Sequence, residues 1–181
     1  MKNNQTISVW DPFVRFFHWS LVASFAIAWL SAEDWRDLHE WAGYSAALLI
    51  GTRLIWGLAG SYYARFQQFV RTPASVAAFL QAMRGRKEPR YIGHNPAGGY
   101  MIVALILAML VTALTGWMYT LDAFWGVQWV MNIHDATATL MLMMVLIHVT
   151  GVLHASYRHK ENLIKAMING KKRGAEPGDI T

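Results

Sequence analysis

Four long stretches of the chain carry almost no charge, and this feature limits the possible fold more than any other. The run 136–157 has no Asp, Glu, Lys or Arg in its 22 residues, and the run 91–121 is also uncharged. A helix needs about 20 apolar residues to cross the hydrocarbon core of a bilayer. We therefore expect an all-α integral membrane protein, a four-helix bundle with spans at about residues 13–32, 39–59, 98–119 and 133–157 of a single domain, residues 1–181.

Composition agrees with a membrane protein and excludes several kinds of metal site. The chain is 55% apolar and 15% charged, with a mean hydropathy of +0.24. It has no cysteine, which excludes disulfides, thiolate metal sites, iron–sulfur clusters and thioether-attached haem. The isoelectric point of about 9.6 is high, but 9 Trp and 10 Met in long uncharged runs are not typical of a nucleic-acid-binding domain.

The charges of the loops predict the orientation of the spans. Loop 60–97 and tail 158–181 are rich in Lys and Arg, whereas loops 31–40 and 120–135 together hold six acids and one arginine, Arg36. By the positive-inside rule, both termini and the long loop are cytoplasmic and the acidic loops lie outside. This arrangement indicates a multi-pass membrane protein. The first span also resembles a signal peptide, but Asp11 and the long segment before it favour an uncleaved span.

Shorter features are expected outside the spans. Thr72-Pro73 followed by an apolar face predicts a short helix, either lying along the membrane interface or an ordinary loop helix, and segment 160–173 has the same character. The last eight residues have the composition of a disordered tail. Five tryptophans are expected at headgroup depth: Trp10, Trp35, Trp41, Trp125 and Trp129.

Histidines inside these apolar spans require polar partners, because an unpaired imidazole in hydrocarbon costs several kcal/mol. His134 and His148 are fourteen residues apart, which on a helix is about 40° short of four turns and about 21 Å of rise. They therefore share one face, near opposite sides of the membrane. His39 and Arg53 have the same spacing on the second span. His154 is rotated by about 200° from His134 and faces away.

Sorting these side chains by depth predicts two pairs. His39 lies with His134 near the outer surface, and His18 lies with His148 toward the inside. Two imidazoles facing each other across a bundle suit a haem with two axial histidines, whereas zinc would require a third or fourth ligand. A single histidine in a span is more often a hydrogen-bonding residue, and a haem-free metal or proton transporter would use the same side chains.

Three arginines are candidates to bind the propionates of such a haem. Arg53 lies at the inner level, Arg36 at the outer lip, and Arg15 one turn below His18. Arg15 and Arg36 are equally compatible with snorkelling to the lipid headgroups. Arg53 lies so deep in its span that a functional role is favoured.

Several motifs together resemble the family of prokaryotic cytochrome b561 and nickel–iron hydrogenase cytochrome b subunits. They are VRFFHW in the first span, LHEWAGYSAALLIGTRL in the second, GHNP before the third and IHDATATLMLMMVLIH in the fourth. The resemblance implies two haems b with His18, His39, His134 and His148 as axial ligands. It also implies electron transfer between a periplasmic redox protein and the quinone pool, the partner being a c-type cytochrome, a flavoprotein or another oxidoreductase subunit.

Members of that family of similar size include quinone reductases that oxidise superoxide, so a self-contained superoxide:quinone oxidoreductase is an alternative function. The acidic outer loops argue against attraction of an anionic substrate there, and they favour a basic partner protein. Either function makes this an electron-transfer protein, a quinone oxidoreductase or a subunit of one. His94, Asn95 and His154 are candidates to bind quinone or pass protons. An alternative role for His94 is to order the loop before Pro96.

Overall fold

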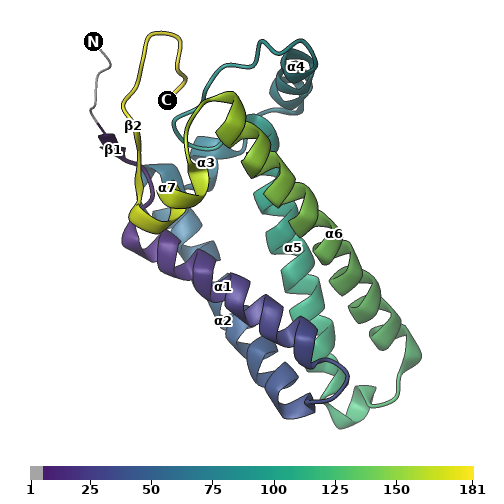
Figure 1. Ribbon diagram of the computed structural model, residues 1–181. Coiled ribbons are helices and arrows are strands. Elements are labelled where there is room, and N and C mark those ends of the chain that lie inside the picture. Colours follow the sequence, from purple (N-terminus) through teal and green to yellow (C-terminus); the bar gives the residue numbers. More distant parts are fainter. Residues whose placement is uncertain (1–5) are drawn as a thin grey trace. The chain divides into compact units, whose positions relative to one another are not determined.

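Four long helices dominate the computed structural model, which describes residues 6–181; the first five residues of the predicted domain lie outside this range. All four are long and apolar enough to cross a membrane, which confirms the predicted spans. The helices begin one to five residues before the predicted bounds, because hydropathy marks only the part solvated by lipid, and they end within one residue of those bounds. They are α1 (Pro12–Ser31), α2 (Arg36–Ala59), α5 (Pro96–Tyr119) and α6 (Gln128–Arg158) (Figure 1).

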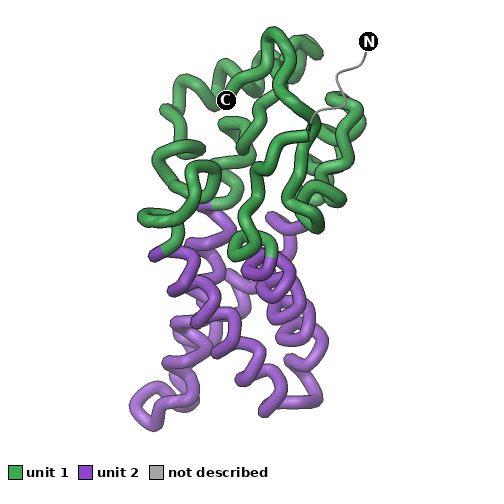
Figure 2. The backbone as a smooth tube through the Cα atoms, turned by 90° about the vertical axis from the view of Figure 1, so that its left-hand side faces the viewer, with its two compact units in different colours: residues 1–15, 56–102, 147–181 green, residues 16–55, 103–146 purple. Residues whose placement is uncertain are grey.

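The chain divides into two compact units, and each long helix contributes residues to both (Figure 2). Unit 1 comprises residues 1–15, 56–102 and 147–181. Unit 2 comprises residues 16–55 and 103–146, and consists almost entirely of helix together with the one-turn helix η2 (Asp122–Phe124).

In unit 2 the helices pack through small and polar side chains. On α2, Ala42, Ala46 and Ile50 are buried with Arg53, and the spacing of three or four residues places them on one helical face. Between α5 and α6, the Thr112 hydroxyl donates a hydrogen bond of 2.9 Å to the Thr137 hydroxyl. Small residues and interhelical hydrogen bonds are the usual means by which membrane helices associate, since lipid removes the hydrophobic drive between them.

Among its described residues, unit 1 has six short elements besides its parts of the long helices. Its apolar core contains Val9, Trp10, Val14, Ala64, Ile92 and Ala166. The short elements are β1 (Thr6–Ser8), η1 (Tyr62–Ala64), α3 (Phe66–Phe69), α4 (Pro73–Arg84), α7 (Leu163–Asn169) and β2 (Lys171–Arg173). β1 and β2 form an antiparallel pair in which Ile7 faces Lys172.

Local capping residues explain where the helices of unit 1 begin. The Asp11 carboxylate accepts hydrogen bonds from the Val14 backbone N–H at 2.9 Å and from the Trp56 indole at 3.2 Å, so it caps α1 and joins it to the end of α2. Thr72 caps α4 by accepting from the Ser75 N–H, which confirms the predicted short helix. Asn95 caps α5, with Pro96 at the first helical position.

The C-terminal segment is more ordered than the sequence indicates. Helix α7 ends at Gly170, whose φ of +79° and close approach to the Trp10 carbonyl both require glycine. Residues 171–173 then form β2 instead of continuing a helix. The prediction of a disordered tail is wrong, because Ile180 exchanges backbone hydrogen bonds with Arg90 and Ile92, both 2.9 Å.

Among the tryptophans expected at headgroup depth, Trp10 is the exception. It is only 6% exposed and belongs to the core of unit 1. Trp35, Trp41, Trp125 and Trp129 are exposed, as residues facing lipid or headgroups would be.

Candidate functional site

His39 is held in one orientation by the helix before it. Its Nδ1 lies 2.8 Å from the Ala28 carbonyl oxygen, which joins α2 to α1 within unit 2. Because a carbonyl oxygen only accepts, Nδ1 must carry the proton. In the neutral ring this leaves Nε2 with its lone pair available.

His134 on α6 is held in the same way by α5. Its Nδ1 lies 2.9 Å from the Thr112 carbonyl oxygen and 3.4 Å from the Thr115 hydroxyl. Gly116 makes room for this ring, since a Cβ at that position would lie 3.0 Å from the His134 Cε1. His134 therefore also keeps Nε2 as the nitrogen with an available lone pair.

These two rings lie next to each other in unit 2. Their centroids are 6.0 Å apart and their planes are inclined by 72°. A metal–imidazole nitrogen bond is about 2 Å long, so two imidazoles on opposite sides of one metal ion have centroids roughly 6 Å apart. A backbone carbonyl on the other ring nitrogen is the usual support of a metal-binding histidine. The distance between the two rings would thus allow His39 and His134 to hold one metal ion together.

The surroundings of this pair favour a metal that brings its own equatorial ligands. In the part of the chain that the structure describes, no three His, Asp or Glu side chains gather where they could share one metal ion. Beside His39 on the inner face of α2 stand Ala42 and Ala46, which occupy little volume. A porphyrin supplies four planar nitrogens and needs two protein ligands, so it matches this donor set.

The other predicted pair is distributed over the two units. His18 lies on α1 in unit 2 and is half-buried, and His148 lies on α6 in unit 1 and is also half-buried. Arg53 is 3% exposed and its guanidinium lies 6.0 Å from the ring of Phe17, the residue before His18. The joint ligation of a metal by His18 and His148 remains a prediction.

The two remaining arginines of the predicted site have protein partners. Arg36 forms an ion pair of 2.7 Å with Glu40 and lies 4.8 Å above the ring of Trp125. Arg15 donates a hydrogen bond of 2.8 Å to the Ile168 carbonyl in α7, in unit 1. Binding of propionates by these arginines also remains a prediction.

The predicted quinone or proton residues lie in three different environments of unit 1. The His94 ring packs between Trp10 and Phe69, with centroid distances of 4.6 and 4.8 Å, which orders the loop before α5. The Asn95 side chain caps α5 and also lines a cavity. The His154 side chain is 52% exposed, and its Nε2 lies 3.9 Å from a carboxylate oxygen of Glu88.

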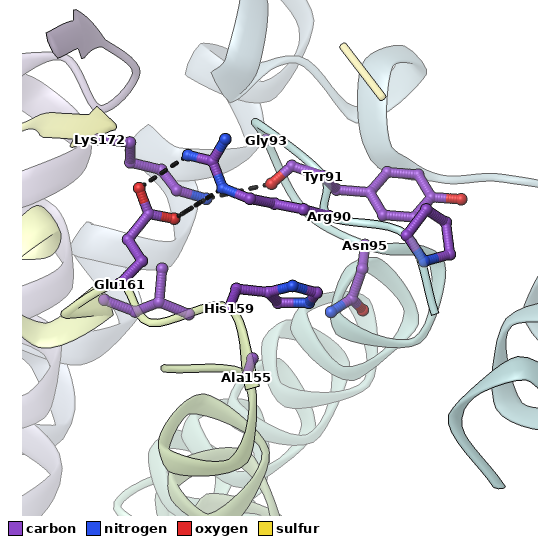
Figure 3. A pocket seen from close by; sticks show the side chains of 10 residues that line it. Arg90, Tyr91, Gly93, Asn95, Ala155, His159, Glu161 and Lys172 are labelled. Carbon is purple, nitrogen blue, oxygen red and sulfur yellow. Dashed lines mark hydrogen bonds and ion pairs between the residues drawn. The ribbon is translucent and has the colours of Figure 1, made fainter. Parts of the chain in front are cut away.

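The cavity of about 50 Å³ lies beside a buried network of charges (Figure 3). Arg90 is bidentate with Glu161, at 2.8 and 3.2 Å, and pairs with Asp179 at 2.5 Å. Lys172 donates to the carbonyls of Tyr91 and Ile92 and lies 3.5 Å from Glu161. Two buried cations thus balance two buried carboxylates.

The pKa values in this network follow from burial and from the ion pairs. Burial alone would raise the pKa of Glu161, but the hydrogen bonds from Arg90 and the charge of Lys172 outweigh it and hold this pKa below its ordinary value. The pKa of Asp179 is lowered because hydrogen bonds from Glu176 and Arg90 likewise outweigh burial. Burial is also the largest cause for Lys172 and lowers its pKa.

These shifts predict that acid releases the C-terminal segment. A carboxylate with a lowered folded-state pKa stabilises the fold above its unfolded value, here 4.5 for Glu161 and 3.8 for Asp179, and this stability is lost as the pH falls through the folded values. We expect the midpoint of thermal unfolding to fall as the pH drops below about 4.5, and to fall less steeply in Glu161→Gln. Thermal unfolding of the wild type and of Glu161→Gln, followed across this pH range, measures the two midpoints. Midpoints that fall equally steeply with pH in the two proteins would contradict the prediction.

Sequence reasoning did not single out the residues of this network. Arg90, Glu161, Lys172 and Asp179 occur in stretches that read as basic loop and polar tail. In the sequence, Glu88 stands out only as the single acid of the long loop. His159 was expected at the surface, but it is half-buried. No local pattern in the sequence could reveal these ion pairs, because Arg90 and its partners lie 71 and 89 positions apart in the chain.

Comparison with known proteins identifies the family of the chain. A family model described as prokaryotic cytochrome b561 matches residues 9–170, which is most of the chain. No curated protein and no solved structure matches the chain. The four apolar helices, the supported histidine pair and the extent of this match lead to one conclusion: the chain belongs to the prokaryotic cytochrome b561 family, and is a membrane b-type cytochrome that binds haem b and takes part in electron transfer.

Proposed function

We propose that this cytochrome holds two haems b with bis-histidine ligation and transfers electrons between a periplasmic redox protein and the quinone pool of the bacterial inner membrane. The observation that carries the proposal is the pair His39 and His134. Their rings are 6.0 Å apart, and each has its Nδ1 proton donated to a backbone carbonyl of a neighbouring helix. A haem-free transporter does not agree with the family.

The residues of unit 2 would hold the first haem through the Nε2 atoms of His39 and His134. When bound, haem b supplies one-electron oxidation and reduction at its iron. The hydrogen bonds to Ala28 and Thr112 keep each ring from turning, and they make the ligating nitrogen more basic. His18 and His148 are the proposed ligands of the second haem, with Arg53 as the cation for its propionates.

The outer ends of the helices in unit 2 offer a docking surface for a basic partner. Glu33, Asp34, Asp37, Asp122 and Asp135 are exposed there, and Glu40 is half-buried. The lone cation of these loops, Arg36, is already paired with Glu40 and lies over Trp125 in the other loop. Asp135 and Glu40 directly follow the ligands His134 and His39 in the sequence, so a partner docked on these acids would approach the proposed haem site.

The charge of the same surface supports one of the two alternative functions. Superoxide is an anion and would be repelled by a rim of carboxylates, whereas a lysine-rich soluble cytochrome would be attracted. The proposal therefore favours a protein partner over a self-contained superoxide:quinone oxidoreductase. We propose that His94, Asn95 and His154, in segments that the loop charges assign to the cytoplasmic side, bind the quinone or pass protons to it.

Electron transfer measured on purified protein tests this function. The reduced cytochrome is mixed anaerobically with a short-chain ubiquinone, and the oxidised cytochrome is mixed with a reduced lysine-rich c-type cytochrome. We expect haem absorbance to report fast transfer in both experiments, with the second rate falling as salt rises. A cytochrome that reacts with superoxide but with neither of these reagents would favour the alternative.

Gly116→Ala is expected to loosen the proposed outer haem without unfolding the bundle. The new methyl group would lie 3.0 Å from Cε1 and 3.3 Å from Nδ1 of His134, so the ring must move. Overpacking of this kind costs about 1–3 kcal/mol, which corresponds to haem loss roughly tenfold faster. Transfer of haem to excess apomyoglobin measures the rate. The matched control is Gly51→Ala in α2, where a Cβ has no neighbour within 4 Å, and equal rates for both variants would contradict the expectation.

A further inference from the structure

Three helices of unit 1 are followed by a residue in the left-handed conformation. These residues are Gly170 after α7, Arg86 after α4 and Lys160 after α6, with φ of +79°, +53° and +51°. Glycine is the usual residue at such a helix end, because any Cβ there crowds the neighbouring backbone. Helix α7 follows this rule, whereas α4 and α6 are followed by a cation.

The turn after α6 is a Schellman motif. The Glu161 N–H donates to the Ser156 carbonyl at 3.0 Å, and the Lys160 N–H donates to the Tyr157 carbonyl at 3.4 Å. The turn after α4 repeats both hydrogen bonds, with Arg86 in the left-handed position. Only backbone groups close these turns, so glycine would form either of them with less strain. Attraction to the carbonyls at the helix end is one explanation for the two cations, and a bound anion is another.

Arg158 brings the two turns together. Its Nε donates a hydrogen bond of 2.9 Å to the Glu88 carboxylate, and its guanidinium also donates to the Arg86 carbonyl. The Glu88 side chain is only 3% exposed, whereas that of Arg158 is 39% exposed. The guanidinium is thus fixed in place by two acceptors of the other turn, while part of the Arg158 side chain remains accessible from outside.

An open groove lies on the surface of the turn after α6. Its volume is about 460 Å³, and it is lined by Ser156, Tyr157, Arg158 and Lys160. Sites for small molecules have volumes of roughly 300–1,000 Å³. The wall of the groove offers two cations and two hydroxyl groups, and no carboxylate of the described residues lines it. Cationic and hydroxyl donors of this kind bind an anion that has several acceptor oxygens, such as a phosphate group.

The side of α6 that leads to the groove is apolar and exposed. Val149, Leu153 and Tyr157 follow one another at intervals of four residues, so they form one stripe along the helix. Their exposed fractions are 46%, 52% and 87%. Because α6 is long and apolar enough to cross a membrane, such a stripe would contact the acyl chains of lipids. The loop charges assign this end of α6 to the cytoplasmic surface, where acidic phospholipids attract basic segments.

We propose that the groove at the end of α6 binds the phosphate headgroup of one acidic phospholipid, whose acyl chains lie along the apolar stripe. Arg158, Lys160 and the Ser156 hydroxyl donate to the phosphate oxygens. Arg86 and Lys87 are exposed, and the bond from Arg158 to the Arg86 carbonyl places their turn beside the groove, so they add to the attraction. This inference does not rest on the proposed electron-transfer function.

Native mass spectrometry of the full-length, haem-loaded protein tests this site. The protein in neutral detergent is titrated with phosphatidylglycerol or with phosphatidylcholine of the same acyl chains, and we expect one phosphatidylglycerol to bind more tightly. Lys160→Gln should weaken this binding roughly fivefold, the loss expected for one cation beside an acidic lipid. The matched control is Lys171→Gln, which removes an exposed lysine of the same unit outside the groove and should bind as the wild type does.

Lys160→Gly separates the charge of this residue from its backbone strain. Glycine lacks the cation, as glutamine does, but it adopts the left-handed turn without strain. In detergent alone, we expect the midpoint of thermal unfolding of Lys160→Gly to lie about 2–4 °C above that of Lys160→Gln. Phosphatidylglycerol should nevertheless bind to both variants equally weakly. Binding to Lys160→Gly as tight as to the wild type would overturn the proposal.

Three further results would also overturn the lipid site. The first is equal affinity of the wild type for phosphatidylglycerol and phosphatidylcholine. The second is a loss of binding in Lys171→Gln as large as in Lys160→Gln, because the attraction would then come from the net charge of unit 1 and not from the groove. The third is displacement of phosphatidylglycerol by millimolar inorganic phosphate, which would identify the groove as a site for free phosphate.

Discussion

His134→Ala is expected to halve the haem b content of the purified protein, leaving one of the two proposed haems in place. The substitution removes an axial nitrogen whose ring is oriented by the Thr112 carbonyl and lies 6.0 Å from its partner ring. Alanine offers no replacement donor, and in the described part of the chain no cluster of three or more candidate metal ligands could take over the iron. The pyridine haemochrome spectrum, referred to protein concentration, measures the loss.

The remaining histidines provide matched comparisons. His39→Ala should cause the same loss as His134→Ala, and the double variant should lose no more than either single one. His148→Ala should remove the other haem, because its proposed partner is His18. His154→Ala should retain both haems, since its side chain lies beside Glu88, with 3.9 Å between Nε2 and a carboxylate oxygen. Loss of a haem from His154→Ala, with full content in His148→Ala, would contradict the ligand assignment.

Arg90→Met is expected to lower the free energy of unfolding by about 3–5 kcal/mol, the usual cost of breaking a buried ion pair by removing one partner. Arg90 is 5% exposed and binds Glu161 and Asp179, whose side chains are 7% and 9% exposed. Without the guanidinium, Glu161 keeps its ion pair with Lys172, whereas Asp179 loses its ion pair with Arg90. For a domain of this size the midpoint of thermal unfolding should fall by about 10 °C, as followed by circular dichroism in detergent.

A second arginine of the same loop provides the control. Arg84, in the last turn of α4, is exposed, and Arg84→Met should leave the midpoint almost unchanged. The variant Glu161→Gln lacks one of the two carboxylates that Arg90 binds. Adding Arg90→Met to this variant should therefore lower the free energy of unfolding by less than Arg90→Met does in the wild type. Equal midpoints for Arg90→Met and Arg84→Met would show that the network contributes little to stability.

The sequence by itself was sufficient to predict the membrane-spanning part of this protein. Lipid requires apolar side chains over about 20 residues of helix, so each span appears as a continuous local pattern. The regular rotation of a helix then places His134 and Arg53 relative to other residues of their own spans. This is why the four helices were predicted, and why the family could be recognised from motifs that lie within those spans.

Only the tertiary structure revealed which groups support the site and how unit 1 is held together. The carbonyls of Ala28 and Thr112 that orient His39 and His134 belong to other helices, and backbone carbonyls leave no mark in a sequence. The tail that reads as disordered is ordered because Arg90 meets Glu161 and Asp179, partners that lie 71 and 89 residues away. Outside the spans, water satisfies charged side chains wherever they are, so nothing local distinguishes a solvated charge from one that is buried and paired.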